Sequence, residues 1–142
     1  MKKKKILVIG TGGTLASTKS ENGLKPSFKI EELLDFFPES KQIANIDCIS
    51  LCDLDSTNLH PDNWVSMAKT IFDNHEKYDG FIITHGTDTM QYSSSALSFA
   101  LKGILKPVVF TGSVFPIEKP NSDARSNFID SVLVASSDLV KE

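Results

Sequence analysis

A run of four apolar residues leads directly into a glycine-rich turn near the start of the chain. The segment Ile6–Ile9 is apolar and mostly β-branched, which is typical of a buried strand. The turn that follows, Gly10–Thr14 (GTGGT), can take positive φ angles and can let a ligand approach the backbone closely. In α/β folds the carboxyl ends of buried parallel strands carry the binding and catalytic groups. This turn is therefore the first candidate for a functional site.

The remaining chain alternates strand-like and helix-like patterns. Three further strands are predicted, at Ile46–Leu54, Phe81–Thr84 and Pro107–Thr111. Helices are predicted at Ile30–Phe37, from Pro61 onward, from about Met90 to Gly103, and near the end of the chain. Such alternation favours parallel strands joined by right-handed crossovers. We expect residues 1–142 to form one α/β domain, a three-layer sandwich of the Rossmann-like or flavodoxin-like type.

Three of these helices carry apolar stripes that we assign to the core. The stripes comprise Trp64, Met67, Ala68, Ile71 and Phe72; Ala96, Leu97, Ala100, Leu101 and Ile104; and Phe128, Ile129, Val132, Leu133 and Ala135. By contrast, the stretch from Thr11 to about Lys29 is polar and shows no clear periodicity. We predict a long loop there, serving either as a lid over the glycine turn or as a plain connector.

Composition and charge exclude several classes of protein. The chain has 15 lysine and arginine residues against 18 aspartate and glutamate residues, a net charge of −3, so neither nucleic acid nor an anionic membrane is an expected partner. No export signal or membrane span follows the basic start, which predicts a cytoplasmic protein. Cys48 and Cys52 would lie roughly 13 Å apart on a strand. We expect them to be free thiols, and no cysteine or histidine spacing suggests a metal site.

Three predicted strand ends carry the same kinds of polar group. They hold Thr11 and Thr14; Asp55, Ser56 and Thr57; and Thr87, Asp88 and Thr89. Because parallel strands end at one edge of the sheet, these groups should converge there. Carboxylates suit a substrate ammonium group, serine and free backbone N–H groups suit a carboxylate, and a threonine hydroxyl can act as a nucleophile. The pattern indicates an amino-acid pocket with a hydroxyl nucleophile.

Each of these residues alone has a simpler interpretation. Threonine, serine and aspartate before a helix commonly serve as N-caps, and for Asp88 or Thr89 taken singly this interpretation is equal in weight to catalysis. His85 is better interpreted as hydrogen-bonded near a strand end than as a catalytic base. A dinucleotide site is disfavoured because Leu15 occupies the third glycine position of the fingerprint and no helix is predicted to follow at once.

Two longer motifs resemble the signatures of the bacterial-type L-asparaginase/glutaminase family. They are Thr11–Ala16 (TGGTLA) and His85–Met90 (HGTDTM), each following a predicted strand. Further similarities are DST at residues 55–57, TGS at 111–113 and SDA at 122–124. The resemblance covers essentially the whole chain and looks like the cytoplasmic type of the family.

The resemblance implies hydrolysis of asparagine to aspartate and ammonia without a metal or cofactor. It implies that Thr14 is the nucleophile, that Thr87 is the second catalytic threonine, and that Asp88 holds the substrate ammonium group. Asp55, Ser56 and Thr57 would form the turn that binds the substrate, with Ser56 on its carboxylate. The backbone of Ser113 would contact the side-chain amide.

Two features depart from the family pattern. Many members carry a tyrosine ten residues after the nucleophile, whereas this chain has Leu24, which leaves the base for Thr14 unassigned. The family's catalytic lysine and smaller C-terminal domain would lie beyond Glu142. The resemblance therefore covers an N-terminal domain, and we expect little activity from these 142 residues alone. In the intact protein a homo-oligomer is expected, in which a neighbouring protomer completes the site.

Two other functions stay open at this point. One is the asparaginase-like subunit of an archaeal tRNA-dependent amidotransferase, which would release ammonia from glutamine. The other is a non-catalytic amino-acid-binding or assembly domain that keeps the pocket without its chemistry. The sequence does not decide between asparagine and glutamine as substrate.

Overall fold

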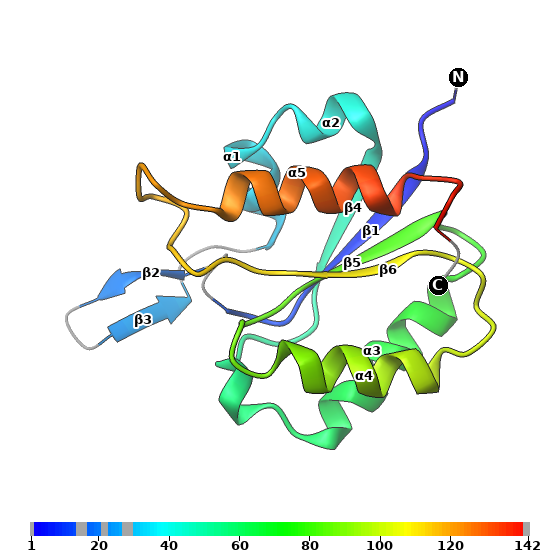
Figure 1. Cartoon of the computed structure of the whole chain (residues 1–142), viewed down its shortest axis with the longest axis horizontal. Helices are drawn as coiled ribbons and strands as arrows, with labels where there is room; N and C mark the ends of the chain where they lie inside the picture. The colour runs from blue at the N-terminus through cyan, green and yellow to red at the C-terminus, as the bar shows by residue number, and fades with distance from the viewer. Residues whose placement is uncertain (1, 14–16, 21–22, 27–29, 141–142) are drawn as a thin grey trace.

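The computed structural model describes residues 2–13, 17–20, 23–26 and 30–140 (Figure 1). Its centre is a parallel four-stranded sheet in the order β4-β1-β5-β6. The strands are β1 (Lys5–Gly10), β4 (Asn45–Ser50), β5 (Gly80–Thr84) and β6 (Val108–Thr111). Of the four, the strand that is first in the chain lies inside the sheet, between the second and the third. This is the flavodoxin-like order, in which a ligand binds where the strand order reverses, beside β1 and β5.

Helices cover both faces of the sheet, as Figure 1 shows. One face carries the 3-10 helix η2 (Ile30–Glu32), α1 (Leu33–Phe36), α2 (Ser40–Ile43) and α5 (Ala124–Ala135). The other carries α3 (Pro61–Asn74) and α4 (Met90–Ala100). A short 3-10 helix, η3 (Ser56–Asn58), follows β4. The predicted three-layer α/β sandwich is confirmed.

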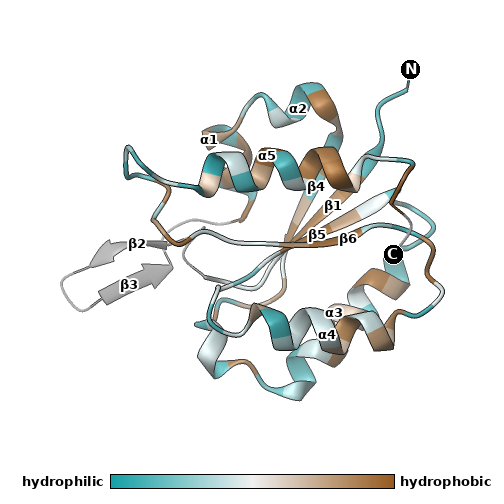
Figure 2. Ribbon diagram, in the orientation of Figure 1, coloured by the Kyte–Doolittle hydropathy of each residue, from teal (hydrophilic) through white to brown (hydrophobic). Residues whose placement is uncertain are grey.

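The central strand β1 divides the core into two layers. Its side chains alternate, so Ile6 and Val8 pack under α5 while Leu7 and Ile9 pack under α3 and α4. All four are at most 1% exposed, and burial of one such side chain is worth about 1.5–3 kcal/mol. The hydropathy colouring of Figure 2 shows apolar residues along the central strands and a mixture of apolar and polar residues along the helices that cover them. Because β1 is packed on both faces, its position in the sheet is fixed, and so is the position of the glycine turn that follows it.

The segment predicted as a loop contains a hairpin. Strands β2 (Ser17–Ser20) and β3 (Gly23–Pro26) pair antiparallel, with Ser20 opposite Gly23 (Figure 1). The prediction of an unstructured loop is therefore wrong for this part. Asparagine and glycine at positions 22 and 23 are residues that favour turns, and they are the only local hint of the hairpin. The hairpin is mostly polar, with Leu24 as its one large apolar residue, so hydrophobic periodicity could not reveal it.

Three of the predicted core residues, Phe72, Ala100 and Leu133, are exposed. Phe72 is 64% exposed and Leu133 is 51% exposed. Each follows directly after a buried residue, Ile71 or Val132, and one helical step of about 100° turns it out of the apolar face. Phe72 stacks on the ring of His75 instead, with 5.3 Å between ring centroids.

Helix α4 also ends earlier than predicted. It stops at Ala100 rather than near Gly103, and Gly103 has a φ of +88° in the turn that follows. The short helix α2 was not predicted at all, since four residues carry too little periodicity. Within the described ranges, no helix has the length and apolar character needed to cross a membrane.

Candidate functional site

The end of β1 is tied to both of its neighbouring strands through Thr11. The hydroxyl of Thr11 donates a hydrogen bond to the carbonyl of Thr84 at 2.8 Å, and its backbone N–H donates to the same oxygen at 3.1 Å. Its carbonyl accepts from the backbone N–H of Leu54 at 3.2 Å. Thr11 is 1% exposed, so its hydroxyl is part of the frame rather than available to a substrate.

At three glycines, the strand ends approach one another too closely to leave room for a β-carbon. Gly13 has a φ of +89°, and a β-carbon there would lie 2.6 Å from the backbone nitrogen of Gly86. A β-carbon on Gly86 would in turn lie 2.7 Å from the hydroxyl of Ser56. Gly12 meets the backbone of Leu54 in the same way. The ends of β1, β4 and β5 therefore converge, as the sequence predicts, with Ser56 against the turn that precedes Thr87.

The residues after β4 are organised by a local cap. Asp55 accepts hydrogen bonds from the hydroxyl of Thr57 at 2.6 Å and from its backbone N–H at 2.9 Å. These bonds hold the pKa of the Asp55 carboxyl below its ordinary value. Asp55 is thus the N-cap of η3, which matches the simpler interpretation of such residues. Ser56 lies between them, 4% exposed, and its position is fixed by this cap.

The side chains of Thr87 and Asp88 are exposed and make no hydrogen bond or ion pair within the described part of the chain. The hydroxyl of Thr89 donates to the carbonyl of Ser56 at 2.8 Å, which connects the ends of β4 and β5. Thr89 occupies the N-cap position of α4 but makes no side-chain cap there. The N-cap interpretation therefore fails for Thr87 and Asp88, whose polar groups are left free to meet a ligand.

A buried chain of hydrogen bonds supports this turn from behind. The indole N–H of Trp64 contacts the hydroxyl of Ser93 at 2.8 Å, Ser93 contacts Nε2 of His85 at 2.8 Å, and Nδ1 of His85 contacts the carbonyl of Gly86 at 2.6 Å. Because a carbonyl only accepts, Nδ1 must carry the proton, and Nε2 then accepts from Ser93. Burial lowers the pKa of His85, which favours this neutral form, although the bond to Gly86 opposes the shift.

This network decides the role of His85. The ring is fully buried and both nitrogens are engaged, so His85 is a structural residue near a strand end, as the sequence predicts. Sequence reasoning missed Ser93. The only hint is that this serine lies in line with the apolar stripe of α4, four residues before the buried Leu97. The polar tip of Trp64 was also missed, because its ring was assigned to the core as a whole.

The turn after β6 lies beside the ends of the other strands of the sheet. A β-carbon on Gly112 would contact the carbonyl of His85, so this turn abuts the end of β5. Ser113 is 1% exposed, and its hydroxyl has no hydrogen-bond partner among the described residues. The structure thus brings Ser56, Thr87, Asp88 and Ser113 to one edge of the sheet. Thr14, the predicted nucleophile, lies outside the described residues.

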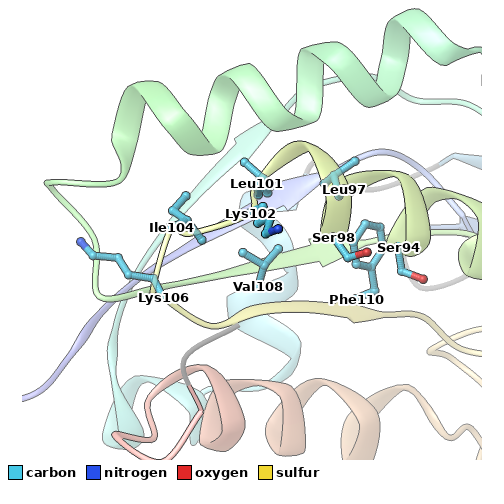
Figure 3. Close-up of a pocket in the computed structure, with 9 residues that line it drawn as sticks. All are labelled: Ser94, Leu97, Ser98, Leu101, Lys102, Ile104, Lys106, Val108 and Phe110. Atoms are coloured by element: carbon cyan, nitrogen blue, oxygen red, sulfur yellow. The ribbon is translucent and has the colours of Figure 1, made fainter.

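A separate hollow of about 140 Å³ lies between α4 and β6 (Figure 3). It is lined mainly by apolar side chains, including Leu97, Val108 and Phe110. None of the polar residues at the strand ends lines it, so it is distinct from the candidate site. Among the residues that the structure describes, no group of three or more histidine, cysteine, aspartate or glutamate side chains could hold a metal ion.

Comparisons with known proteins agree with this geometry. The sequence model described as "Asparaginase, N-terminal" matches residues 5–142. The chain is 45% identical over 124 residues to the L-asparaginase of Thermococcus kodakarensis, covering 87% of this chain and 38% of that protein. It is 39% identical over 138 residues to a subunit of the glutamyl-tRNA(Gln) amidotransferase of Saccharolobus solfataricus, covering 94% of this chain and 31% of that protein.

Solved structures give the same result. The probable cytoplasmic L-asparaginase of Campylobacter jejuni superimposes with a TM-score of 0.89 at 30% identity, covering 98% of this chain and 42% of that one. L-asparaginase I of Vibrio cholerae superimposes with a TM-score of 0.85 at 35% identity, covering 95% and 42%. The chain thus spans well under half the length of these relatives.

Proposed function

The chain belongs to the asparaginase family, whose N-terminal domain it matches, and from this premise we propose that it forms the N-terminal domain of an L-asparaginase. The reaction is hydrolysis of the side-chain amide of L-asparagine to L-aspartate and ammonia. The observation that carries the proposal is the edge of the sheet where Thr87 and Asp88 stand exposed beside the buried Ser56. Their hydroxyl and carboxylate groups match the charged and polar groups of an amino-acid amide.

In this proposal Thr14 is the nucleophile. Its hydroxyl oxygen attacks the carbonyl carbon of the amide, and its proton passes by way of a base to the departing nitrogen. The C–N bond breaks, ammonia leaves, and the substrate remains as an ester on Thr14. Water then attacks the ester, which releases aspartate and restores the hydroxyl group. Thr87 orients this water, and backbone N–H groups of the glycine turns stabilise the oxyanion.

The remaining residues bind the two charged ends of the substrate. Asp88 pairs with the ammonium group, and Ser56 donates a hydrogen bond to the carboxylate. Asp55 and Thr57 act through the cap that holds Ser56 in place. The backbone of Ser113 meets the side-chain amide. Charge-assisted bonds of this kind supply most of the affinity for so small a substrate.

A second candidate is the glutamine-hydrolysing component of a tRNA-dependent amidotransferase. The 39% identity to the amidotransferase protein of Saccharolobus solfataricus favours it. The two candidates differ in the preferred amide and in the need for a partner protein. We rank the asparaginase first because of the higher identity, 45%, to the relative from Thermococcus kodakarensis. We also assign the protein to the cytoplasm, like the relative from Campylobacter jejuni by its description.

Ammonia release by the full-length protein tests the proposal. Wild type should release ammonia from L-asparagine, and Thr14→Ala should lose at least about 1,000-fold in kcat, because the nucleophile is gone. Thr70→Ala is the matched control, since this threonine lies on α3 and, among the residues that the structure describes, its hydroxyl bonds only to the carbonyl of Ser66. Turnover of Thr14→Ala equal to that of wild type would remove Thr14 as the nucleophile. Faster turnover of L-glutamine than of L-asparagine by wild type would favour the second candidate.

A further inference from the structure

We propose that Asp123 and Asn127 are positioning residues that set the length of substrate side chain the site accepts, by fixing the turn Gly112–Phe115 after β6. This inference rests on the proposed function, because it assigns a second layer of residues to the same site. Asp123 immediately precedes α5 and Asn127 lies in its first turn. Helix α5 packs against one face of the sheet.

Asp123 acts on the turn rather than on its own helix. It stands at the N-cap position of α5 but makes no side-chain cap there. The hydroxyl of Ser122 caps the helix instead, accepting from the backbone N–H of Ala124 at 3.1 Å. The carboxylate of Asp123 accepts from the backbone N–H groups of Val114, at 3.1 Å, and Phe115, at 3.0 Å. An aspartate at an N-cap position usually accepts hydrogen bonds from the first backbone N–H groups of its own helix. Here the carboxylate instead binds backbone N–H groups of the turn after β6.

Asn127 holds the other end of the same turn. Its side-chain N–H groups donate to the carbonyl of Gly112 at 2.9 Å and to the carboxylate of Asp123 at 2.9 Å. The turn is therefore gripped on both sides of Ser113, at the carbonyl before it and at the two amides after it. We call these bonds the Asp123–Asn127 clamp. Burial opposes ionisation of Asp123, but the bonds from Phe115, Val114 and Asn127 outweigh it and keep the pKa of its carboxyl low.

The clamped turn borders the proposed substrate pocket. Gly112 lies against the carbonyl of His85 and against the side chain of Met90, on either side of Thr87 and Asp88 in the chain. If Ser56 and Asp88 hold the amino-acid end of the substrate, the turn around Ser113 meets the other end. Asparagine and glutamine differ there by one methylene group. A difference of this size is worth about 10- to 200-fold in kcat/KM in a rigid pocket, so the rigidity of the turn should decide how strongly the site discriminates.

The test compares kcat/KM for L-asparagine and L-glutamine in the full-length protein. Asp123→Ala and Asn127→Ala should each bring the ratio of the two values toward one, by roughly 10-fold. The ratio is independent of how much enzyme is folded, because both substrates meet the same population. A purely structural role would lower both values and leave the ratio unchanged. Asp130→Ala is the matched control, since this exposed carboxylate lies on the same helix and should leave the ratio as in wild type.

The outcomes separate this inference from the proposed function. If wild type releases no ammonia from either amide, the proposed function fails and this inference fails with it. If wild type is active and both clamp variants keep its ratio within twofold, the inference alone is overturned. Should Asp123→Ala not fold, as judged by circular dichroism, Asn127→Ala alone provides the test, because it keeps the bonds that the backbone N–H groups of Val114 and Phe115 donate to Asp123.

Discussion

Gly13 lies so close to the backbone of Gly86 that it has no room for a β-carbon, and Gly86 in turn has none because Ser56 lies against it. A β-carbon on Gly13 would lie 2.6 Å from the backbone nitrogen of Gly86, and one on Gly86 would lie 2.7 Å from the hydroxyl of Ser56. These contacts join three separate strand ends, through backbone atoms between Gly13 and Gly86 and through the Ser56 side chain at the end of β4. They place the two threonine-bearing turns of the family motifs side by side.

The first prediction concerns Gly13→Ala. The substitution combines an unfavourable φ of +89° with a backbone clash, so the free energy of unfolding should fall by at least about 3 kcal/mol. Gly103→Ala is the matched control, because its φ of +88° is nearly the same but nothing lies within 4 Å of the added carbon. It should lose only about 1–2 kcal/mol. Urea denaturation measures both, and equal losses would contradict the importance of the contact with Gly86.

The second prediction separates two neighbouring threonines. Thr87→Val should lower amide hydrolysis about 100-fold or more, with a change in the free energy of unfolding within about 0.5 kcal/mol, because its hydroxyl is exposed. Thr89→Val should lower the free energy of unfolding by about 1 kcal/mol, since it removes the bond to the carbonyl of Ser56. Steady-state kinetics and urea denaturation of the two variants test this. The pattern would be refuted if Thr87→Val lost more stability than Thr89→Val.

The third prediction concerns pH. The folded protein holds the pKa of His85 below its ordinary value of 6.5 through burial. As pH falls through 6.5 toward the folded value, the unfolded chain takes up a proton that the folded protein refuses, so the free energy of unfolding decreases. His85→Gln should flatten this slope at pH values below 6.5. Nitrogen-15 NMR of the wild type should show the proton on Nδ1. A proton on Nε2 would contradict the proposed direction of the bonds through Ser93.

The fourth prediction concerns the two cysteines. Both are free in the structure, as the sequence predicts. Burial, together with the nearby carboxylates of Glu31 and Asp47, raises the pKa of Cys48 to about 12, and burial raises the pKa of Cys52 as well. At pH 8 only about one Cys48 in 10,000 is a thiolate, so native protein should react very slowly with a disulfide reagent. Rapid labelling of Cys48 without denaturant would contradict this.

The fold could be read from the sequence largely because three of the four strands of the parallel sheet, β1, β5 and β6, are apolar runs that end in glycine-containing turns. Segments such as Ile6–Ile9 and Phe81–Thr84 leave few alternatives once helices separate them. Periodicity failed where burial does not determine structure. The β2–β3 hairpin is mostly polar. Phe72 and Leu133 lie at the margin of their stripes, where one helical step decides between core and solvent.

The sequence located the candidate site, but it did not show which of its side chains are held by hydrogen bonds and which can meet a ligand. The convergence of Ser56 and Thr87 follows from the parallel sheet. Which threonine is bonded and which is free depends on distances between distant residues, such as that from Thr89 to the carbonyl of Ser56. Polar side chains used in second-layer contacts, such as Ser93 and Asp123, carry no local pattern that distinguishes them from ordinary helix residues.

The backbone frame around Gly13 and Gly86 has a consequence for how such a domain can diversify. The strand ends hold one another through glycine contacts and through the bonds of Thr11 and Thr89 to carbonyl oxygens. Exposed residues that face a ligand, such as Thr87 and Asp88, can therefore be exchanged without disrupting the scaffold that presents them. The same backbone arrangement can then serve enzymes with different amide substrates. This accords with relatives named both as L-asparaginases and as components of amidotransferases.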